Sequence, residues 1–386
     1  MSSVPLVKNE NSFGRSRSDP YRVMLVDDSS VIRGLLSRWL GADNAIEIVG
    51  SAANGQAALN SIDRMDPEII VLDIEMPIMD GLTALPQILK AKPNAQVLMS
   101  STLTSKNATE SLRAMALGAA DYVPKPTTNR EVISSKSFQT EMIEKIISLA
   151  AAKRKQLGQE PFKDVDSSEV VADRDIKPRS NGNEAKTINA SASSPKIIGI
   201  GSSTGGPQAL LNFLNGIKSN LSVPVVITQH MPSAFTKILA GHLSKATGLI
   251  CEEAEDGMLL KAGQVYVAPG DHHMTISKED GKFFVRLNQE APENFCRPAV
   301  DTMFASLAEV YGPQALGVIL TGMGQDGLKG SKLIVKGGGT IIAQNEETSV
   351  VWGMPGAVSN AGICNAVLPL DQLGSKVQQL TTGSRL

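Results

Sequence analysis

Two groups of side chains in this chain of 386 residues have the types and spacing to do chemistry. The first group is acidic, with Asp27 and Asp28 directly after one short apolar run and Asp73 directly after another. Three carboxylates that meet at strand ends repel one another and need a cation, and hard oxygen ligands suit Mg²⁺. Ser101 and Lys125 follow two further apolar runs. Their hydroxyl and ammonium groups could bind a phosphoryl group that Asp73 accepts by nucleophilic attack.

The second group begins with a glycine- and serine-rich turn at Gly201–Gly205, which reads G-S-S-T-G. It fits the G-x-S-x-G spacing that lifts a serine nucleophile, here Ser203, above the edge of a sheet. The same turn also fits a glycine-rich cradle for a phosphate group. Taken alone, the turn leaves a nucleophile, a phosphate cradle and ordinary turn chemistry open.

A serine nucleophile needs a base, normally a histidine that a carboxylate orients. The chain has four histidines, at His230, His242, His272 and His273. His230 follows the next apolar run after the serine turn, so we expect the two side chains at one sheet edge. Asp326 lies on the glycine-rich loop after Leu316–Leu320, at the same edge. Of the other histidines, one falls inside an amphipathic helix pattern and two lie in a turn that could touch substrate.

Two alternatives to catalysis at Ser203 fit the sequence poorly. A dinucleotide site needs an acidic residue at the end of its second strand for the ribose, but this strand ends in Thr228-Gln229-His230. A Walker-type phosphate loop needs a lysine, and none follows the glycines of this turn. We therefore favour a triad of Ser203, His230 and Asp326, in an order that differs from the Ser, acid, His order of α/β-hydrolases.

Both groups depend on strands that end at one sheet edge, and the apolar periodicity predicts two such sheets. Between residues 21 and 152, five short buried runs alternate with helical patterns, which predicts a doubly wound parallel sheet. The strands are expected at Arg22–Val26, Ile46–Ala52, Ile69–Leu72, Gln96–Met99 and Asp121–Val123.

A second alternation runs over residues 196–386, so the predicted fold class is α/β with two doubly wound parallel-sheet domains. Its strands are expected at Ile197–Gly201, Val225–Thr228, Leu316–Leu320 and Thr340–Ala343. A β-rich insertion with an antiparallel β-hairpin is expected at Val265–Val267, Met274–Ser277 and Phe283–Leu287. Residues 1–20 and 153–195 are polar and lack periodicity, which predicts a disordered tail and a linker.

The composition narrows the class of protein. A net charge of −2 gives no electrostatic footprint for DNA or RNA, so we expect no nucleic-acid partner. No apolar run approaches the roughly 18 residues of a membrane span, so we expect no direct membrane insertion. Three widely spaced cysteines without a C-x-x-C pair indicate buried thiols of a reducing compartment, which predicts a cytoplasmic protein.

Four stretches of the first domain carry a family resemblance: L-V-D-D at Leu25–Asp28, D-I-E-M-P-I-M-D-G at Asp73–Gly81, the hydroxyl at Ser101, and K-P at Lys125-Pro126. Together they resemble the receiver domain of bacterial response regulators. The resemblance implies a flavodoxin-like receiver over residues 21–152 whose Asp73 is phosphorylated by a histidine kinase.

The same resemblance implies roles for individual residues. Mg²⁺ would be held by Asp27, Asp28, Asp73 and the backbone carbonyl of Glu75. The phosphoryl group would be sensed by Ser101, Lys125 and the aromatic Tyr122. The peptide bond between Lys125 and Pro126 is a candidate for the cis form, which an X-Pro bond adopts at little cost.

The second domain contains I-G-x-S-T-G-G at the serine turn, Q-H-M-P-x-x-F-T around His230 and T-G-M-G-x-D-G around Asp326. These stretches resemble the chemotaxis protein-glutamate methylesterase family. The resemblance implies a carboxylic ester hydrolase that removes glutamate 5-O-methyl esters from methyl-accepting chemoreceptors, with deamidation of certain glutamines, for chemotactic adaptation. No cofactor is needed for the ester reaction.

Further residues of this domain are candidates for contact with the reacting groups. Backbone N–H groups after Ser203, near Thr204, and on the loop at Met323 could stabilise an oxyanion. Arg297 lies in C-R-P-A-V-D at Cys296–Asp301, which matches a stretch that lines the family's active-site region.

A receiver ahead of an esterase predicts regulation by phosphorylation. The unphosphorylated receiver would pack over the serine site, and phosphorylation of Asp73 would relieve this. The predicted linker is long, which lowers the effective concentration of one domain near the other. The rival interpretation is a non-enzymatic, receiver-linked regulator whose second domain binds a ligand or a protein.

Overall fold

The computed structural model describes residues 19–102, 104–126, 135–163, 191 and 193–382. The predicted disordered tail lies outside the described residues, apart from Asp19 and Pro20. So do residues 164–190 and 192 of the predicted linker.

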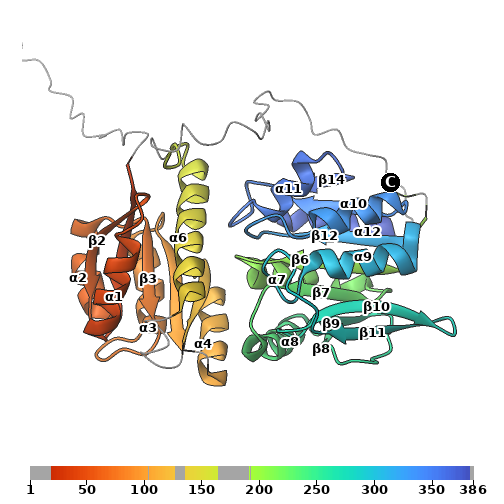
Figure 1. The fold of residues 1–386 in the computed structure, drawn as a ribbon, viewed down its shortest axis with the longest axis horizontal. Helices are drawn as coiled ribbons and strands as arrows, with labels where there is room; N and C mark the ends of the chain where they lie inside the picture. Colours follow the sequence, from red (N-terminus) through yellow and green to blue (C-terminus); the bar gives the residue numbers. More distant parts are fainter. Residues whose placement is uncertain (1–18, 103, 127–134, 164–190, 192, 383–386) are drawn as a thin grey trace, which may run out of the picture.

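The first unit is a parallel sheet of five strands in the order β2-β1-β3-β4-β5 (Figure 1). The strands are β1 (Tyr21–Val26), β2 (Ile46–Ala52), β3 (Ile69–Asp73), β4 (Gln96–Thr102) and β5 (Asp121–Lys125). All five were predicted, and this order is the doubly wound arrangement. The predicted cis form at Lys125–Pro126 was wrong: among the described residues, the cis peptide bond joins Arg297 to Pro298.

Helices cover both faces of this sheet. They are α1 (Ser30–Leu40), α2 (Gly55–Met65), α3 (Gly81–Ala91), α4 (Ser105–Ala116) and α6 (Lys136–Gln156). Each begins after a polar residue whose side chain accepts a hydrogen bond from the first turn: Ser29, Asn54, Asp80, Thr104 and Ser135. Such a cap is typically worth about 1 kcal/mol. No helix in the described part of the chain is both long and apolar enough to cross a membrane.

The second unit is a seven-stranded parallel sheet in the order β14-β13-β12-β6-β7-β9-β8. Its strands are β6 (Ile197–Ser202), β7 (Val225–Gln229), β8 (Ile250–Glu253), β9 (Gln264–Val267), β12 (Ala315–Ile319), β13 (Thr340–Gln344) and β14 (Ala366–Leu368). A separate antiparallel hairpin joins β10 (His273–Glu279) to β11 (Lys282–Asn288). Strand β6 lies at the centre, between β12 and β7, so the loops after these three strands meet at one edge.

Two helical layers enclose this sheet. The helices are α7 (Gly206–Ile217), α8 (Ser233–Thr247), α9 (Val300–Tyr311), α10 (Leu328–Lys336), α11 (Met354–Asn360) and α12 (Leu370–Thr382). Helices α7, α8 and α12 bury one face of the sheet, whereas α9 and α10 bury the other together with the hairpin. The predicted α/β architecture is therefore confirmed.

The two units pack against each other through α4 and α6 of the first unit (Figure 1). Helix α4 lies against α7 and α8. The rings of Tyr122 and Phe235 stack with 4.5 Å between their centroids. On α6, the Ser148 hydroxyl donates to Met323 Sδ at 3.1 Å and Gln156 Nε2 donates to the Ser349 carbonyl at 3.1 Å.

Candidate active site

The serine turn joins the end of β6 to the start of α7. Ser203 donates its backbone N–H to the Thr321 carbonyl at 3.0 Å, which ties the turn to the loop after β12. The neighbouring Ser202 is 0% exposed and donates its hydroxyl to Gln229 Oε1 at 2.7 Å. The side chain of Ser202 is therefore committed to the interior, and Ser203 is the serine available at the surface of the turn.

Gln229 holds the serine turn and the histidine loop together. Its Nε2 donates to the carbonyl of Ser203 at 2.9 Å and to that of His230 at 3.1 Å. This requires a glycine at position 206, because a Cβ there would lie 1.9 Å from Gln229 Oε1. Sequence reasoning missed Gln229, although its place at the end of β7, directly before His230, was a usable signal.

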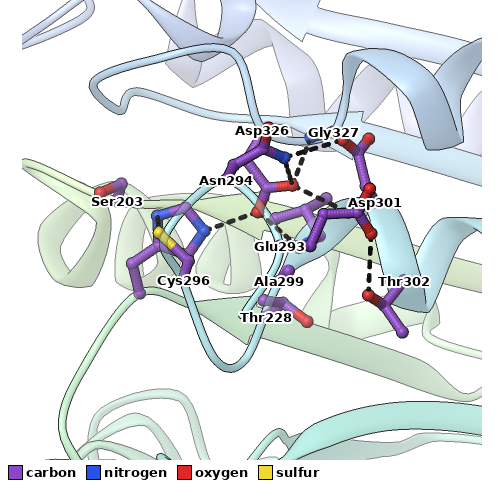
Figure 2. Close-up of polar contacts among 12 residues, drawn as sticks. Ser203, Thr228, Glu293, Asn294, Cys296, Ala299, Asp301, Thr302, Asp326 and Gly327 are labelled. Carbon is purple, nitrogen blue, oxygen red and sulfur yellow. Dashed lines mark hydrogen bonds and ion pairs between the residues drawn. The ribbon is translucent and has the colours of Figure 1, made fainter. Parts of the chain in front are cut away.

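His230 and Asp326 form a hydrogen-bonded pair in which Asp326 is buried and His230 is largely buried. His230 donates from Nε2 to Asp326 Oδ2 at 2.7 Å. The second side of the ring faces a thiol, with Cys296 Sγ 3.5 Å from His230 Nδ1 (Figure 2). Burial alone would lower the pKa of His230, but the hydrogen bonds to Asp326 and Cys296 outweigh it, and the pKa lies above its usual 6.5. Within the described residues, Ser203 Oγ makes no hydrogen bond.

Asp326 is 2% exposed and is held by backbone amides at the start of α9. Its Oδ2 accepts from Val300 N at 2.6 Å, and its Oδ1 accepts from Asp301 N at 3.0 Å. Burial would raise the pKa of Asp326, but the hydrogen bonds from His230 and these amides lower it below its usual value. The residue therefore stays an acceptor, which fixes the proton of the histidine on Nε2.

Asn294 and Asp301 complete the surroundings of this carboxylate (Figure 2). Asn294 Nδ2 donates to Asp326 Oδ1 and to Asp301 Oδ2, each at 3.0 Å. Asp301 Oδ1 accepts from Gly330 N at 2.7 Å. Sequence reasoning missed Asn294, because nothing in its local pattern points to a residue 32 positions further along the chain.

The two candidate oxyanion donors are the backbone amides of Thr204 and Met323. Among the described residues, neither Thr204 N nor Met323 N has a hydrogen-bond acceptor. The Thr204 hydroxyl is also buried without a partner. Close approach of the two loops requires Gly322, since a Cβ there would lie 2.9 Å from Ser203 Cβ and 2.5 Å from Met354 Sδ.

Arg297 and His273 have structural partners. The Arg297 guanidinium binds Asp271 at 2.6 Å and also donates to the carbonyls of Gln289 and Glu290. His273 is buried; its Nε2 donates to the Ala291 carbonyl at 3.1 Å, and its Nδ1 accepts from Ala299 N at 3.2 Å. These contacts brace the loop that contains Cys296 rather than reaching toward Ser203.

The acidic residues of the first unit also come together. One carboxylate oxygen from each of Asp27, Asp28 and Asp73 lies within 4.8 Å of the others. Lys125 Nζ contacts Asp27 and lies 3.0 Å from Asp73 Oδ2. Burial raises the pKa of Asp73 to about 6, with Asp27 adding to the rise and Lys125 opposing it. The three carboxylates, of which Asp28 is exposed, offer the hard oxygen ligands that a divalent cation prefers. Such a cation would offset the repulsion between the carboxylates.

The predicted phosphoryl-sensing residues surround this cluster at different depths. Ser101 is buried, with its hydroxyl 3.3 Å from the Ser111 hydroxyl of α4. Tyr122 is buried against Phe235 of the second unit. Glu75 is exposed at its side chain and pairs with Lys106 at 2.9 Å, so only its backbone carbonyl remains as a candidate ligand.

Two family models match the chain in the order of its two units. The response regulator receiver domain matches residues 23–136. The CheB methylesterase domain matches residues 198–377. The acidic cluster of the first unit is thus typical of the Mg²⁺-binding phosphorylation site of a receiver.

Curated relatives match almost the whole chain. It is 46% identical over 376 residues to the protein-glutamate methylesterase/protein-glutamine glutaminase of group 2 operon of Rhodospirillum centenum, with 94% of each chain covered. It is 48% identical over 370 residues to protein-glutamate methylesterase/protein-glutamine glutaminase 1 of Paramagnetospirillum magneticum, with 94% of this chain and 97% of that protein covered.

A solved structure matches the second unit. The crystal structure of the Thermotoga maritima CheB methylesterase catalytic domain is 44% identical and covers 49% of this chain and 100% of that chain, with a TM-score of 0.47. Because both curated relatives align with nearly its full length, the chain belongs to the protein-glutamate methylesterase/protein-glutamine glutaminase family, with a receiver domain followed by a CheB methylesterase domain.

Proposed function

We propose that this protein hydrolyses glutamate 5-O-methyl esters on methyl-accepting chemoreceptors, and deamidates certain receptor glutamines, through Ser203, His230 and Asp326. Phosphorylation of Asp73 by a histidine kinase would regulate this activity in the cytoplasm. The observation that carries the proposal is the hydrogen-bonded pair of His230 and Asp326, 2.7 Å apart, beside Ser203, the half-buried serine of the turn (Figure 2). A base that a carboxylate orients, next to a serine, is the arrangement that acyl transfer needs.

The chemistry follows from the proton positions. With its proton on Nε2, His230 presents a lone pair at Nδ1, which takes the proton of Ser203 Oγ as this oxygen attacks the ester carbonyl. The same proton then leaves with methanol, or with ammonia when the substrate is a glutamine. Water next attacks the glutamyl-serine ester with His230 again acting as base, which restores the serine. Catalytic hydrogen bonds are often long without substrate and close in the complex.

The unpaired amides of Thr204 and Met323 support their role as oxyanion donors. Each N–H lacks an acceptor in the described part of the chain, so a developing oxyanion would displace only water from it. A donor of this kind is worth roughly 10²–10³ in rate. Arg297 is a weaker candidate for substrate contact, because Asp271 and two carbonyls already occupy its donors.

In the receiver, we propose that Asp27, Asp28, Asp73 and the carbonyl of Glu75 hold Mg²⁺, which would neutralise the carboxylates and the incoming phosphoryl group. Lys125 would then bind a phosphoryl oxygen, since its ammonium already contacts Asp73. Ser101 would have to turn its hydroxyl away from Ser111 to reach the same group.

The packing of the two domains supports inhibition by the unphosphorylated receiver. Helix α6 contacts Met323 on the candidate oxyanion loop. Tyr122 stacks on Phe235 near the start of α8, and this helix begins shortly after His230 in the chain. A docked receiver would therefore limit access of a bulky protein substrate to Ser203.

The test is methanol release from membranes that contain methylated chemoreceptors, with Ser203→Ala compared against the unaltered chain. We expect the rate to fall by at least roughly 10³-fold, while the circular dichroism spectrum stays unchanged. The rival, a non-enzymatic binding regulator, predicts that Ser203→Ala leaves function intact, so retained methanol release would reject the triad.

A further inference from the structure

A tight turn at the edge of the serine site has a large aromatic residue at its tip. Glu293 and Cys296 exchange two backbone hydrogen bonds, at 3.1 and 2.9 Å. Between them, Asn294 has φ 51° and Phe295 has φ 63°. Two central residues with positive φ define the geometry of a type I′ turn, which strongly favours asparagine first and glycine second.

Phe295 occupies the position where glycine is the unstrained choice. The chain follows that rule in its other turn of this kind, between β10 and β11, where Asp280 has φ 47° and Gly281 has φ 77°. A bulky residue in the left-handed region is strained, and such strain concentrates at functional sites. Packing does not compensate for it, because the Phe295 side chain is 102% exposed.

The residues on either side of this turn are anchored, so the turn cannot relax easily. On the first side, Glu293 pairs with Lys329 at 3.0 Å. On the other side, Arg297 pairs with Asp271 at 2.6 Å. The aromatic ring is therefore presented from a fixed backbone.

Both neighbours of Phe295 contact the candidate catalytic pair. Asn294 Nδ2 is 3.0 Å from Asp326 Oδ1, and Cys296 Sγ is 3.5 Å from His230 Nδ1 (Figure 2). Phe295 is therefore exposed on a turn that borders the candidate site, one residue from Cys296, whose sulfur faces Nδ1 of His230.

We propose that Phe295 is a specificity-determining contact for the protein substrate, packing against apolar side chains that flank the modified glutamate. The inference rests on the proposed function, since it takes the segment that carries the ester as its partner. An aromatic ring offers a large apolar surface with only two side-chain torsions to fix. On a rigid turn it adds binding energy with little loss of conformational entropy.

The experiment compares Phe295→Gly and Phe295→Tyr in the full chain, with methanol release measured from membranes that contain a methylated chemoreceptor. For Phe295→Gly we expect KM to rise at least about tenfold, kcat to change less than about twofold, and the melting temperature to rise as strain is relieved. For Phe295→Tyr we expect KM to stay near that of the unaltered chain. An unchanged KM in Phe295→Gly, or a lowered melting temperature, would overturn the proposal.

Gly281→Phe is the matched control, because it places an aromatic residue at the equivalent position of the β10–β11 turn, where φ is 77°. It should lower the melting temperature by introducing the same backbone strain, and it should leave KM unchanged. A second readout uses two peptides that carry a glutamate methyl ester flanked by leucines or by serines. Phe295→Gly should abolish the preference of the unaltered chain for the leucine peptide. Equal use of both peptides by the unaltered chain would overturn the proposal.

The failure of this inference can be told apart from the failure of the proposed function. If Ser203→Ala keeps turning over substrate, the proposed function fails. If only the Phe295 results are negative, this inference alone fails.

Discussion

At the scale of single residues, the orientation of the His230 ring decides which nitrogen can act. Asp326 accepts from Nε2, so the basic lone pair lies on Nδ1, where Cys296 Sγ is 3.5 Å away. When the ring is protonated, Nε2–H faces a carboxylate and Nδ1–H faces a sulfur atom. Both contacts favour the imidazolium, which is why the pKa of His230 is raised despite burial.

This raised pKa predicts the pH dependence of the esterase. His230 must be neutral to take a proton from Ser203, so activity is lost as the pH falls through the pKa of His230. We expect kcat/KM to rise with pH through a midpoint above 6.5. Cys296→Ala should move the midpoint toward 6.5, because it removes one of the two contacts that raise the pKa. A pH profile of methanol release for both proteins checks this, and an unchanged or higher midpoint in Cys296→Ala would contradict it.

Some residues of this site were predictable from sequence and others were not. Ser203, His230 and Asp326 each follow a predicted strand, so the rule that loops after parallel strands share an edge was enough to group them. Cys296 and Asn294 lie on the long connection after the β10–β11 hairpin, where no periodicity applies. Their contacts depend on how that connection folds back over the sheet edge.

At the scale of elements, the start of α9 and the carboxylate of Asp326 stabilise each other. The residue before the helix is Ala299, which has no side-chain oxygen to cap it. Asp326, from the loop after β12, accepts from the first two amides of the helix instead. The positive end of the helix dipole also favours the ionised carboxylate. One residue therefore serves both the packing of α9 and the orientation of His230.

Two inactivating substitutions should consequently differ in stability. We expect Asp326→Ala to lower the free energy of unfolding by about 1–3 kcal/mol, because it leaves buried amides unpaired. Ser203→Ala should change it by less than about 0.5 kcal/mol. The pKa of Asp326 is lowered in the folded protein. Its ionised carboxylate therefore adds to the free energy of unfolding at neutral pH, and this stabilisation is lost as the pH falls below about 4. Urea unfolding of the three proteins at pH 7 measures the difference, and equal midpoints would refute the capping role.

The sheets could be predicted more fully than the segments around them. Every strand of the receiver was expected from its continuous apolar run. In the second domain, Val265–Val267 was assigned to the β-hairpin insertion, but β9 pairs in parallel with β7 and β8 in the main sheet. Strand β8 was missed because it is a short edge strand with two glutamates, and β14 because it has only three residues. Short strands at sheet edges contain too few residues for a pattern.

At the scale of the whole molecule, the receiver and the esterase share an interface that reaches the serine site. A stacked aromatic pair, Tyr122 and Phe235, lies between β5 and α8. Helix α6 runs on to Gln156, four residues into the predicted linker, and contacts the loop of Met323. Sequence patterns could not predict this interface, because its residues are also ordinary members of each domain's core.

Weakening this interface should raise the basal activity. Tyr122→Leu removes an aromatic stack worth about 0.5–1.5 kcal/mol. If the docked receiver restricts access, the undocked fraction and the basal rate should rise by roughly 2- to 10-fold. Methanol release without a phosphodonor measures this, and the fragment 196–386 gives the upper limit. An unchanged rate in both would remove the inhibitory model.

The order of the strands along the chain has a consequence for synthesis. Strand β6 pairs with β12, which is encoded more than a hundred residues later, and Asp326 follows β12. On the ribosome, the receiver has all of its strands once Lys125 has emerged, whereas the centre of the second sheet waits for β12. The strands of the receiver are thus complete before those of the esterase. If the docked receiver restricts access to Ser203, a newly made molecule has no interval in which the assembled serine site exists without the receiver.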